Sequence, residues 1–478
     1  MKKLVPIYPV LLGLYFLLAY YSTNYHFATL KSMVVPLVIL LCSIGLVWWL
    51  VQLVVRNWHK SALLVSLLTI GFFVQGYLRY IYGSDATLPA LSILVLGLLV
   101  ILVAFKVKSS IILSTVSLVS SILLICLIGT LGVETARRTD RPQTTLEELN
   151  WESKSNNPDI YLIVPDSYPN EITLKEWYEF DNSRFISELE SKGFCVGKDS
   201  YGAYPGTGKF FAGLVSMRYL ESDETGILEE VNWWDSEVQT LLREEGYRTI
   251  DDGRGWGGGG VSPKADANLA CPTVLNPTRS LLSGTLLPDT LGVRGLYDRV
   301  DFKEWVLFQF EELKKIPRIE APTYTVVHTL GAHGPYVFTA DGSNLVSTDW
   351  KERLVEQVQF TNKLLLDSID VILETSSVPP IIIIMADTGP ILDMVNYTNK
   401  NIRARLGILE AFYLPGLTEE QKSSFGAQVN TFRLLFNYYF DKNYEILPDR
   451  HFFYAKDSNA SSPPYRLVEV TDTFRIED

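Results

Sequence analysis

Four consecutive isoleucines at positions 381–384 continue through Met385 and Ala386 into Asp387. An apolar run of this length without polar alternation is typical of a parallel strand that is buried on both faces. The first polar side chain after such a strand lies at its carboxyl end, where open α/β sheets place their chemistry. The run therefore predicts an α/β sheet with Asp387 at its functional edge.

Two other segments follow the same design. Residues 158–168 run apolar into Asp166, and residues 323–336 run apolar into His328 and His333. We expect the three strands to bring two aspartates and two histidines to one edge of one sheet. Such a set of side chains suits the binding of hard cations and phosphoryl-transfer chemistry.

Strand and helix patterns alternate from residue 158 to about residue 470. This alternation predicts a mainly parallel central sheet with helices on both faces, in one α/β domain that covers residues 158–478. The expected strands are 159–165, 246–251, 323–330, 380–386 and 407–413, and the expected helices are 182–192, 207–219, 233–245, 301–315 and 350–375.

The N-terminal part of the chain is apolar instead. Its stretches of roughly transmembrane length are 4–22, 33–55, 61–82, 88–105 and 110–131. Most basic residues near them fall in alternate loops, at Lys2, Lys3, Arg56, Lys60, Lys106 and Lys108. The positive-inside rule then places the N-terminus in the cytoplasm, and an odd number of spans places the rest of the chain outside it. We therefore expect a multi-pass membrane domain of five transmembrane helices in residues 1–133 and a polar linker in residues 134–157.

Charge separates the same two parts. Residues 1–133 carry eight basic residues and one acidic residue, a net charge of +7. The whole chain has a net charge of −12, so residues 134–478 carry −19. This acidic outer domain argues against nucleic acid as a partner, because binding of nucleic acid requires a basic surface.

Cys195 and Cys271 lie in the outer domain, where a disulfide bond is chemically permitted. The sequence leaves two alternatives open, a bridge between them or two buried thiols. The glycine-rich stretch 251–266 also has two interpretations. It is either a solvated insertion or a lid at the end of a strand, in which case Arg254 or Trp256 contacts substrate.

Asp166 and Asp387 each have two interpretations. Each carboxylate can cap the turn that follows its strand, or it can bind a cation. Two carboxylates that converge on one point repel each other unless a cation lies between them. Their shared position at strand ends therefore favours cation binding.

Thr207 follows a Pro-Gly turn at the expected start of a helix. Its hydroxyl is either a plain N-cap or a nucleophile whose alkoxide is favoured by a metal and by the helix N-terminus. Lys209 lies close by and is a candidate for binding substrate. His333, in the turn after its strand, is a candidate for contacting substrate, whereas His328 is either a satisfied core histidine or a second substrate-binding residue.

Six segments occur in the order seen in bacterial membrane-anchored sulfatase-like proteins of the alkaline phosphatase superfamily. They are NPDIYLIVPDSY, FDNSRFISELESKGFCVGKDSYGAYPGT, HTLGAHGPYVF, VEQVQFTNKLLLDSID, IIIIMADTGP, and VNTFRLLFNYYF followed by LPDR. The chain resembles these proteins over roughly residues 155–455. Lipoteichoic acid synthases and phosphoethanolamine transferases are better-known relatives. The resemblance implies an alkaline-phosphatase-like α/β domain on the outer side of the cell membrane.

The resemblance also implies roles for particular residues. Asp166, Thr207 and Asp387 resemble the metal-bound set, with Thr207 as the nucleophile that carries a covalent phospho-intermediate. His333 resembles the histidine that contacts the transferred group or the leaving group. The implied reaction moves a phosphoglycerol or phosphoethanolamine type of group onto or off a membrane lipid or a lipid-linked envelope glycan.

One position departs from this pattern. The relatives usually have Asp-His-Gly after the strand, whereas this chain has Asp387, Thr388 and Gly389. Imidazole is a good ligand for zinc and manganese, and a neutral hydroxyl is a poor one. Thr388 stands at the position of this missing histidine ligand. We expect one divalent ion at the site, and its identity among manganese, magnesium, zinc and calcium stays open.

Two functions remain open. The first is a membrane-anchored, metal-dependent phosphotransferase or ester hydrolase. The second is a catalytically weakened or inactive relative that acts as a binding or scaffold protein in envelope polysaccharide assembly. Thr388 favours the second function, whereas the joint presence of both aspartates, Thr207 and His333 favours the first, which is the preferred interpretation.

Overall fold

The computed structural model describes residues 6–23, 33–82, 143–144, 146, 151, 157–222, 229, 236–253, 262, 264–269, 271, 294–390, 398–455 and 466–474. The chain divides into two compact units. One comprises Met1–Thr139 with Pro272–Asp301, and the other comprises Asp140–Cys271 with Phe302–Asp478.

Three helices form the described part of the N-terminal residues: α1 (Tyr8–Thr23), α2 (Val34–Val55) and α3 (Trp58–Tyr82). They coincide with the first three apolar stretches, while the stretches 88–105 and 110–131 lie outside the described residues. Among the described helices, α2 alone is long and apolar enough to cross a membrane. Its Trp49, Leu53 and Val54 side chains are more than half exposed, as expected of side chains that face lipid.

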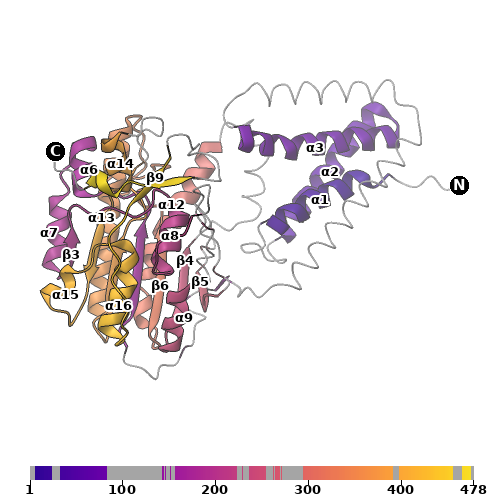
Figure 1. The fold of residues 1–478 in the computed structure, drawn as a ribbon. Coiled ribbons are helices and arrows are strands. Elements are labelled where there is room, and N and C mark those ends of the chain that lie inside the picture. Colours follow the sequence, from indigo (N-terminus) through magenta and orange to yellow (C-terminus); the bar gives the residue numbers. More distant parts are fainter. Residues whose placement is uncertain are drawn as a thin grey trace. The chain divides into compact units, whose positions relative to one another are not determined.

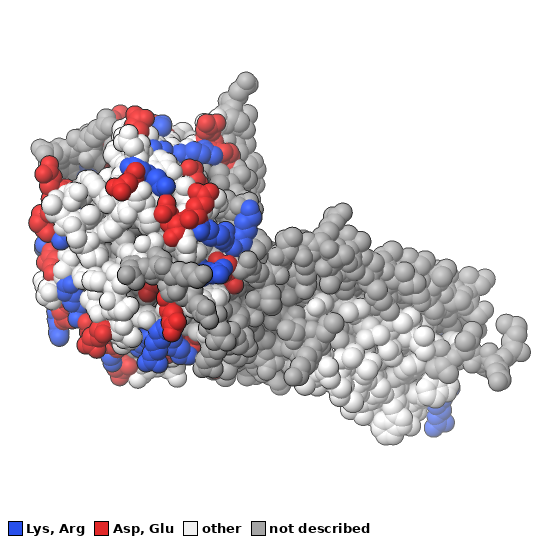
Figure 2. Space-filling model, turned by 90° about the horizontal axis from the view of Figure 1, so that it is seen from below, with Lys and Arg blue, Asp and Glu red and all other residues white. Residues whose placement is uncertain are grey.

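The surface of these helices is nearly free of charge. On the face drawn in Figure 2, their described residues are almost uniformly white, whereas blue and red side chains cover the other unit. The N-terminal helices are therefore compatible with a membrane part of the protein.

The C-terminal unit is built on an eight-stranded sheet (Figure 1). The strands lie side by side in the order β1-β5-β4-β6-β2-β7-β8-β3. Neighbouring strands from β1 to β7 are parallel, and β8 is antiparallel to both β7 and β3. The predicted α/β domain with a mainly parallel sheet is confirmed. In chain order the strands are β1 (Gln143–Thr144), β2 (Ile160–Pro165), β3 (Cys195–Gly197), β4 (Arg248–Gly253), β5 (Ala267–Leu269), β6 (Thr323–Thr329), β7 (Ile381–Met385) and β8 (Glu410–Tyr413).

Helices cover both faces of this sheet. Tyr324 of β6 contacts Phe432 of α16, whereas Asp252 of β4, opposite Val327 in the register, faces Gln309 of α12. Because successive side chains of a strand alternate between faces, α16 and α12 lie on opposite sides. The helices are α6 (Glu171–Tyr178), α7 (Ser183–Ser191), α8 (Thr207–Val215), α9 (Glu237–Glu244), α12 (Arg294–Leu313), α13 (Trp350–Thr375), α14 (Asn399–Leu406), α15 (Glu419–Ser423) and α16 (Thr431–Tyr439).

Several bounds differ from those expected. The helix expected at 207–219 ends at Val215, and the strand expected at 407–413 begins only at Glu410. The latter starts late because residues 406–408 form hydrogen bonds with other loops instead of with a strand. The short antiparallel pair β9 (Phe452–Tyr454) and β10 (Leu467–Glu469), like β3 and β5, was not expected, because three residues are too few to show a period.

The structure also decides between the alternatives for the two outer cysteines. Cys195 and Cys271 are both free thiols, so the disulfide interpretation is wrong. Cys271 is buried, and Cys195 is only partly buried.

Candidate metal centre

Three titratable side chains meet at the carboxyl edge of the sheet. Asp166 follows β2, Asp387 follows β7, and His328 lies near the end of β6. One ligand atom from each of them lies within 4.8 Å of the others, and all three side chains are buried. The strand order explains this convergence, because β2 lies between β6 and β7 and places Val164 opposite His328.

The geometry of this group fits a divalent metal ion. The distance between His328 Nε2 and Asp166 Oδ2 is 3.5 Å. Two ligands of one tetrahedral zinc ion, at ordinary bond lengths, are separated by roughly 3.4 Å. His328 Nε2 is also buried without a hydrogen-bond partner among the described residues, and such a buried nitrogen requires an explanation, for example an ion. These observations favour His328 as a cation ligand over a satisfied core histidine.

The electrostatics point the same way. Burial raises the pKa of Asp387, and repulsion from Asp166 raises it further. Burial also acts to raise the pKa of Asp166, but the adjacent imidazole of His328, with the charge of His333, holds it well below its usual range. Burial lowers the pKa of His328, but Asp166 and Asp387 more than offset this, so that its pKa is raised. A cation would relieve the repulsion between the two carboxylates.

Thr207 is the first residue of α8, and its hydroxyl donates a hydrogen bond to Asp387 Oδ2. The N-cap position belongs to Gly206, and no side chain caps this helix end. The interpretation of Thr207 as a plain N-cap is therefore wrong. Because the first N–H groups of a helix lack partners within the helix, this terminus can bind an anion beside Asp387.

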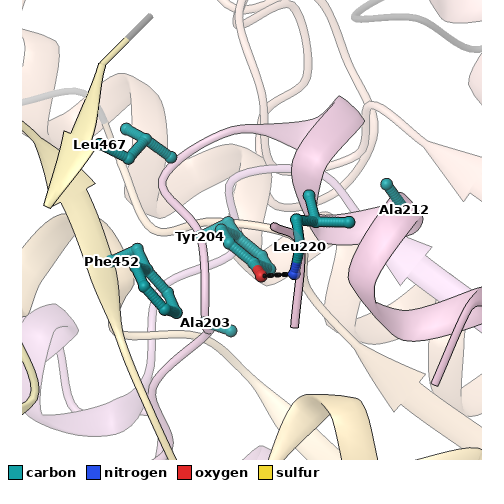
Figure 3. Packing of buried hydrophobic residues seen from close by; sticks show 6 residues of the cluster. All are labelled: Ala203, Tyr204, Ala212, Leu220, Phe452 and Leu467. Atoms are coloured by element: carbon teal, nitrogen blue, oxygen red, sulfur yellow. Dashed lines mark hydrogen bonds between the residues drawn. The ribbon is translucent and has the colours of Figure 1, made fainter. Parts of the chain in front are cut away.

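Aromatic packing holds the loop that leads to Thr207. Tyr204 stacks on Phe452 with ring centroids 5.4 Å apart, and its hydroxyl accepts a hydrogen bond of 2.8 Å from the backbone N–H of Leu220. Figure 3 shows this tyrosine between the strand that carries Phe452 and the helix that carries Ala212. The loop is therefore anchored to α8 and to the C-terminal strands.

Ser167 is a site residue that sequence reasoning missed. Its backbone N–H donates to Asp387 Oδ1 at 3.0 Å, and its hydroxyl donates to Asp166 Oδ1 at 2.8 Å. Ser167 has a positive φ of 59°, which is uncommon for a residue other than glycine. Its position directly after Asp166 was the only signal in the sequence.

Thr388 lies beside the centre. Its Oγ1 is 3.4 Å from Asp387 Oδ1 and 3.4 Å from Ser167 Oγ, and it is buried. Position 389 requires a glycine because the backbone there passes close to α14. A Cβ atom there would lie 2.1 Å from the carbonyl oxygen of Ala404.

The other predicted site residues lie outside the Asp166–His328–Asp387 group. His333 is partly buried, and its carbonyl oxygen accepts a 2.7 Å hydrogen bond from Gln357. Its charge acts on Asp166, so it lies near the group. Lys209 Nζ donates to the backbone oxygen of Glu229 at 2.7 Å. Arg254 and Trp256 lie outside the described residues.

A separate buried acid, Glu410 of β8, predicts a pH dependence of stability. Burial raises the pKa of Glu410 to about 8, Ser200 lowers it through a hydrogen bond of 2.9 Å, and the charge of Asp449 raises it. An unfolded glutamate, with a pKa of 4.5, loses its proton first. The free energy of unfolding is therefore expected to fall as pH rises from about 4.5 to 8, by at most about 1.4 kcal/mol per pH unit.

The measurement is the thermal unfolding of the full-length protein and its Glu410→Gln variant between pH 5 and pH 8. The melting temperature of the parent should fall relative to that of the variant as pH rises. Glu419→Gln, at an exposed side chain, is the control and should run parallel to the parent. Parallel curves for Glu410→Gln as well would show that Glu410 is already ionised in the folded protein.

Comparison with known proteins gives similar structures but no match from sequence. No family model and no curated protein matches the chain. Among solved structures, the C-terminal periplasmic domain of EcEptC from Escherichia coli has a TM-score of 0.42 and 11% identity, over 68% of this chain and 96% of that domain. A protein in the alkaline phosphatase superfamily from Vibrio parahaemolyticus has a TM-score of 0.41 and 12% identity, over 68% of this chain and 80% of that one.

A third match is an integral membrane protein. The integral membrane protein lipooligosaccharide phosphoethanolamine transferase A (EptA) from Neisseria meningitidis has a TM-score of 0.35 and 14% identity, over 86% of this chain and 88% of that one. The solved structures similar to this chain thus include phosphoethanolamine transferases and a member of the alkaline phosphatase superfamily, the group of proteins that its motifs resemble.

Proposed function

We propose that this chain is a membrane-anchored, metal-dependent enzyme that transfers or hydrolyses a phospho-group through a covalent intermediate on Thr207. The observation that carries the proposal is the hydrogen bond from the Thr207 hydroxyl to Asp387, beside the buried pair of Asp166 and His328. A hydroxyl in contact with a buried carboxylate is placed to attack phosphorus. The backbone N–H groups of the same helix N-terminus are placed to bind the anionic oxygens of the phospho-group.

The residues that would hold the metal are Asp166, Asp387 and His328. Thr388 supplies no nitrogen, and His328 supplies the imidazole instead, from β6. A set of two carboxylates and one imidazole favours zinc or manganese over magnesium or calcium, which prefer oxygen ligands. When bound, a divalent cation polarises the phosphoryl oxygens and favours the ionised form of a hydroxyl beside it.

The chain's own residues account for the proton and bond changes. The bond from Thr207 Oγ1 to phosphorus forms, and the bond from phosphorus to the leaving alcohol oxygen breaks. The threonine proton passes to Asp387 Oδ2, which already accepts its hydrogen bond. His333 gives a proton to the leaving oxygen. An acceptor hydroxyl or water then attacks phosphorus and passes its proton to His333, and the Thr207 oxygen leaves and takes back its proton from Asp387 Oδ2.

We infer that the substrate carries a phosphoglycerol or phosphoethanolamine type of group on a membrane lipid or lipid-linked envelope glycan. A membrane domain of residues 1–133 with five helices and a linker at 134–157 would hold residues 158–478 outside the cytoplasm, close to such substrates. The acidic outer domain and the apolar N-terminal stretches support this arrangement.

The test of the function uses the full-length protein in detergent, loaded with Mn²⁺ and mixed with bis(4-nitrophenyl) phosphate. We expect a stoichiometric burst of 4-nitrophenolate and a peptide that carries the 4-nitrophenyl phosphoryl group on Thr207, detected by mass spectrometry. If the protein binds Mn²⁺ but forms no adduct at Thr207, the enzyme proposal fails, and a binding or scaffold role takes its place.

The topology gives a separate prediction. Reporter domains fused after residue 150 or at the C-terminus should be active only on the outer side of the membrane, because an odd number of spans precedes them. A fusion after residue 57, between the second and third spans, should report the cytoplasm and serves as the control. Cytoplasmic signals from all three fusions would contradict the five-span arrangement.

A further inference from the structure

The segment from α14 into β8 contacts the loops that carry Asp166, Thr207 and Asp387. The backbone N–H of Leu409 donates to the oxygen of Tyr168 at 3.1 Å, in the loop after Asp166. The N–H of Gly202 donates to the oxygen of Leu406 at 2.7 Å, in the loop before Thr207. This one segment therefore holds loops that are far apart in the sequence.

Arg405 of this segment joins two of those loops through its side chain. Its Nε and Nη2 donate to the carbonyl oxygen of Pro205, at 3.1 and 2.9 Å. Its Nη1 donates to the carbonyl oxygen of Gly389, and the N–H of Gly389 returns a 2.7 Å hydrogen bond to the oxygen of Arg405. Pro205 precedes Thr207 by two residues, and Gly389 follows Asp387 by two residues.

We propose that Arg405 is a positioning residue that fixes the distance between the hydroxyl of Thr207 and the carboxylate of Asp387. The function of that hydroxyl as nucleophile rests on the proposed function, but the placement of Asp387 also matters for metal binding alone. A planar guanidinium group presents donors in fixed directions, so it can hold two carbonyl groups at a set separation. The flexible ammonium group of a lysine cannot do so with the same geometry.

The matched control lies two residues away on the same helix. Arg403 donates through Nε and Nη2 to the carbonyl oxygen of Thr473, at 3.2 and 2.8 Å. Arg403→Ala thus removes a comparable clamp from α14 to a backbone carbonyl, and these two hydrogen bonds go to Thr473 and not to the loops of Thr207 and Asp387. Loss of stability alone should affect both variants alike.

The experiment compares Arg405→Ala, Arg405→Lys and Arg403→Ala in the full-length protein, with Mn²⁺ affinity and turnover of bis(4-nitrophenyl) phosphate as readouts. A displacement of about 1 Å can lower a rate by about 10²-fold. We expect a loss of that size in kcat for Arg405→Ala, with little change in KM, and Mn²⁺ binding weaker by about tenfold. Arg405→Lys should keep the melting temperature but not kcat, and Arg403→Ala should keep both kcat and Mn²⁺ affinity.

Two further results separate this inference from the proposed function. Methylguanidinium added to the assay should restore part of the kcat of Arg405→Ala and none of that of Arg405→Lys, whose side chain fills the space. If the parent binds Mn²⁺ without turnover, the proposed function fails, and weaker Mn²⁺ binding by Arg405→Ala than by Arg403→Ala still supports the clamp. If Arg405→Ala and Arg403→Ala had the same Mn²⁺ affinity, and the same kcat wherever turnover can be measured, the positioning role of Arg405 would be overturned.

Discussion

Replacement of Thr207 by alanine is expected to lower turnover of bis(4-nitrophenyl) phosphate by at least about 10³-fold. A nucleophile that forms a covalent intermediate has no substitute in the site. The fold should be preserved, because Gly206 rather than Thr207 occupies the N-cap of α8. The affinity for Mn²⁺ should change little, since both aspartates and His328 remain.

Turnover, the mass of the phosphorylated peptide and calorimetric Mn²⁺ binding measure these three quantities separately. Thr207→Ser keeps a hydroxyl at the same position and should retain part of the activity and the adduct. Ser216→Ala removes a hydroxyl at the other end of α8, where it donates to the backbone oxygen of Ala212, and should leave the rate unchanged. A Thr207→Ala variant with the parent rate would refute the nucleophile assignment.

Removal of the imidazole in His328→Ala is expected to weaken zinc or manganese binding by more than about 10²-fold. Structural zinc sites bind with about 10–16 kcal/mol, which over four ligands is roughly 3 kcal/mol for each, and about 1.4 kcal/mol corresponds to a factor of ten. Calorimetry and elemental analysis of the purified full-length protein measure this loss. The prediction follows from the short distance between His328 Nε2 and Asp166 Oδ2.

The position next to Asp387 supplies the control. Thr388 Oγ1 lies 3.4 Å from Asp387 Oδ1, so the double variant His328→Ala with Thr388→His offers an imidazole from β7's loop in place of the one from β6. We expect this variant to recover a substantial part of the lost affinity, because ligand number matters more than the strand that supplies the ligand. Unchanged metal affinity in His328→Ala would show that this histidine is not a ligand.

Much of the fold can be predicted from the sequence because buried parallel strands leave a direct signal. The isoleucines of β7 and the apolar run of β2 are buried at every position, and an unbroken apolar run is what such burial requires. The long amphipathic pattern at 350–375 gave α13 with the same bounds. Short strands such as β3 have no period to detect, and their pairing depends on partners far away in the chain.

The sequence by itself determined which side chains end the buried strands, and hence the placement of Asp166 and Asp387 at one edge. The sequence also predicted two histidines at that edge, but only the tertiary structure decided that His328 is the one within ligand distance of the aspartates, and that Ser167 and Arg405 tie the loops together. The physical reason is the range of the interactions. The burial pattern of a strand is local, because it depends on the apolar or polar character of neighbouring residues. The direction of an imidazole or a guanidinium group depends instead on strand order and on loops more than a hundred residues away in the chain.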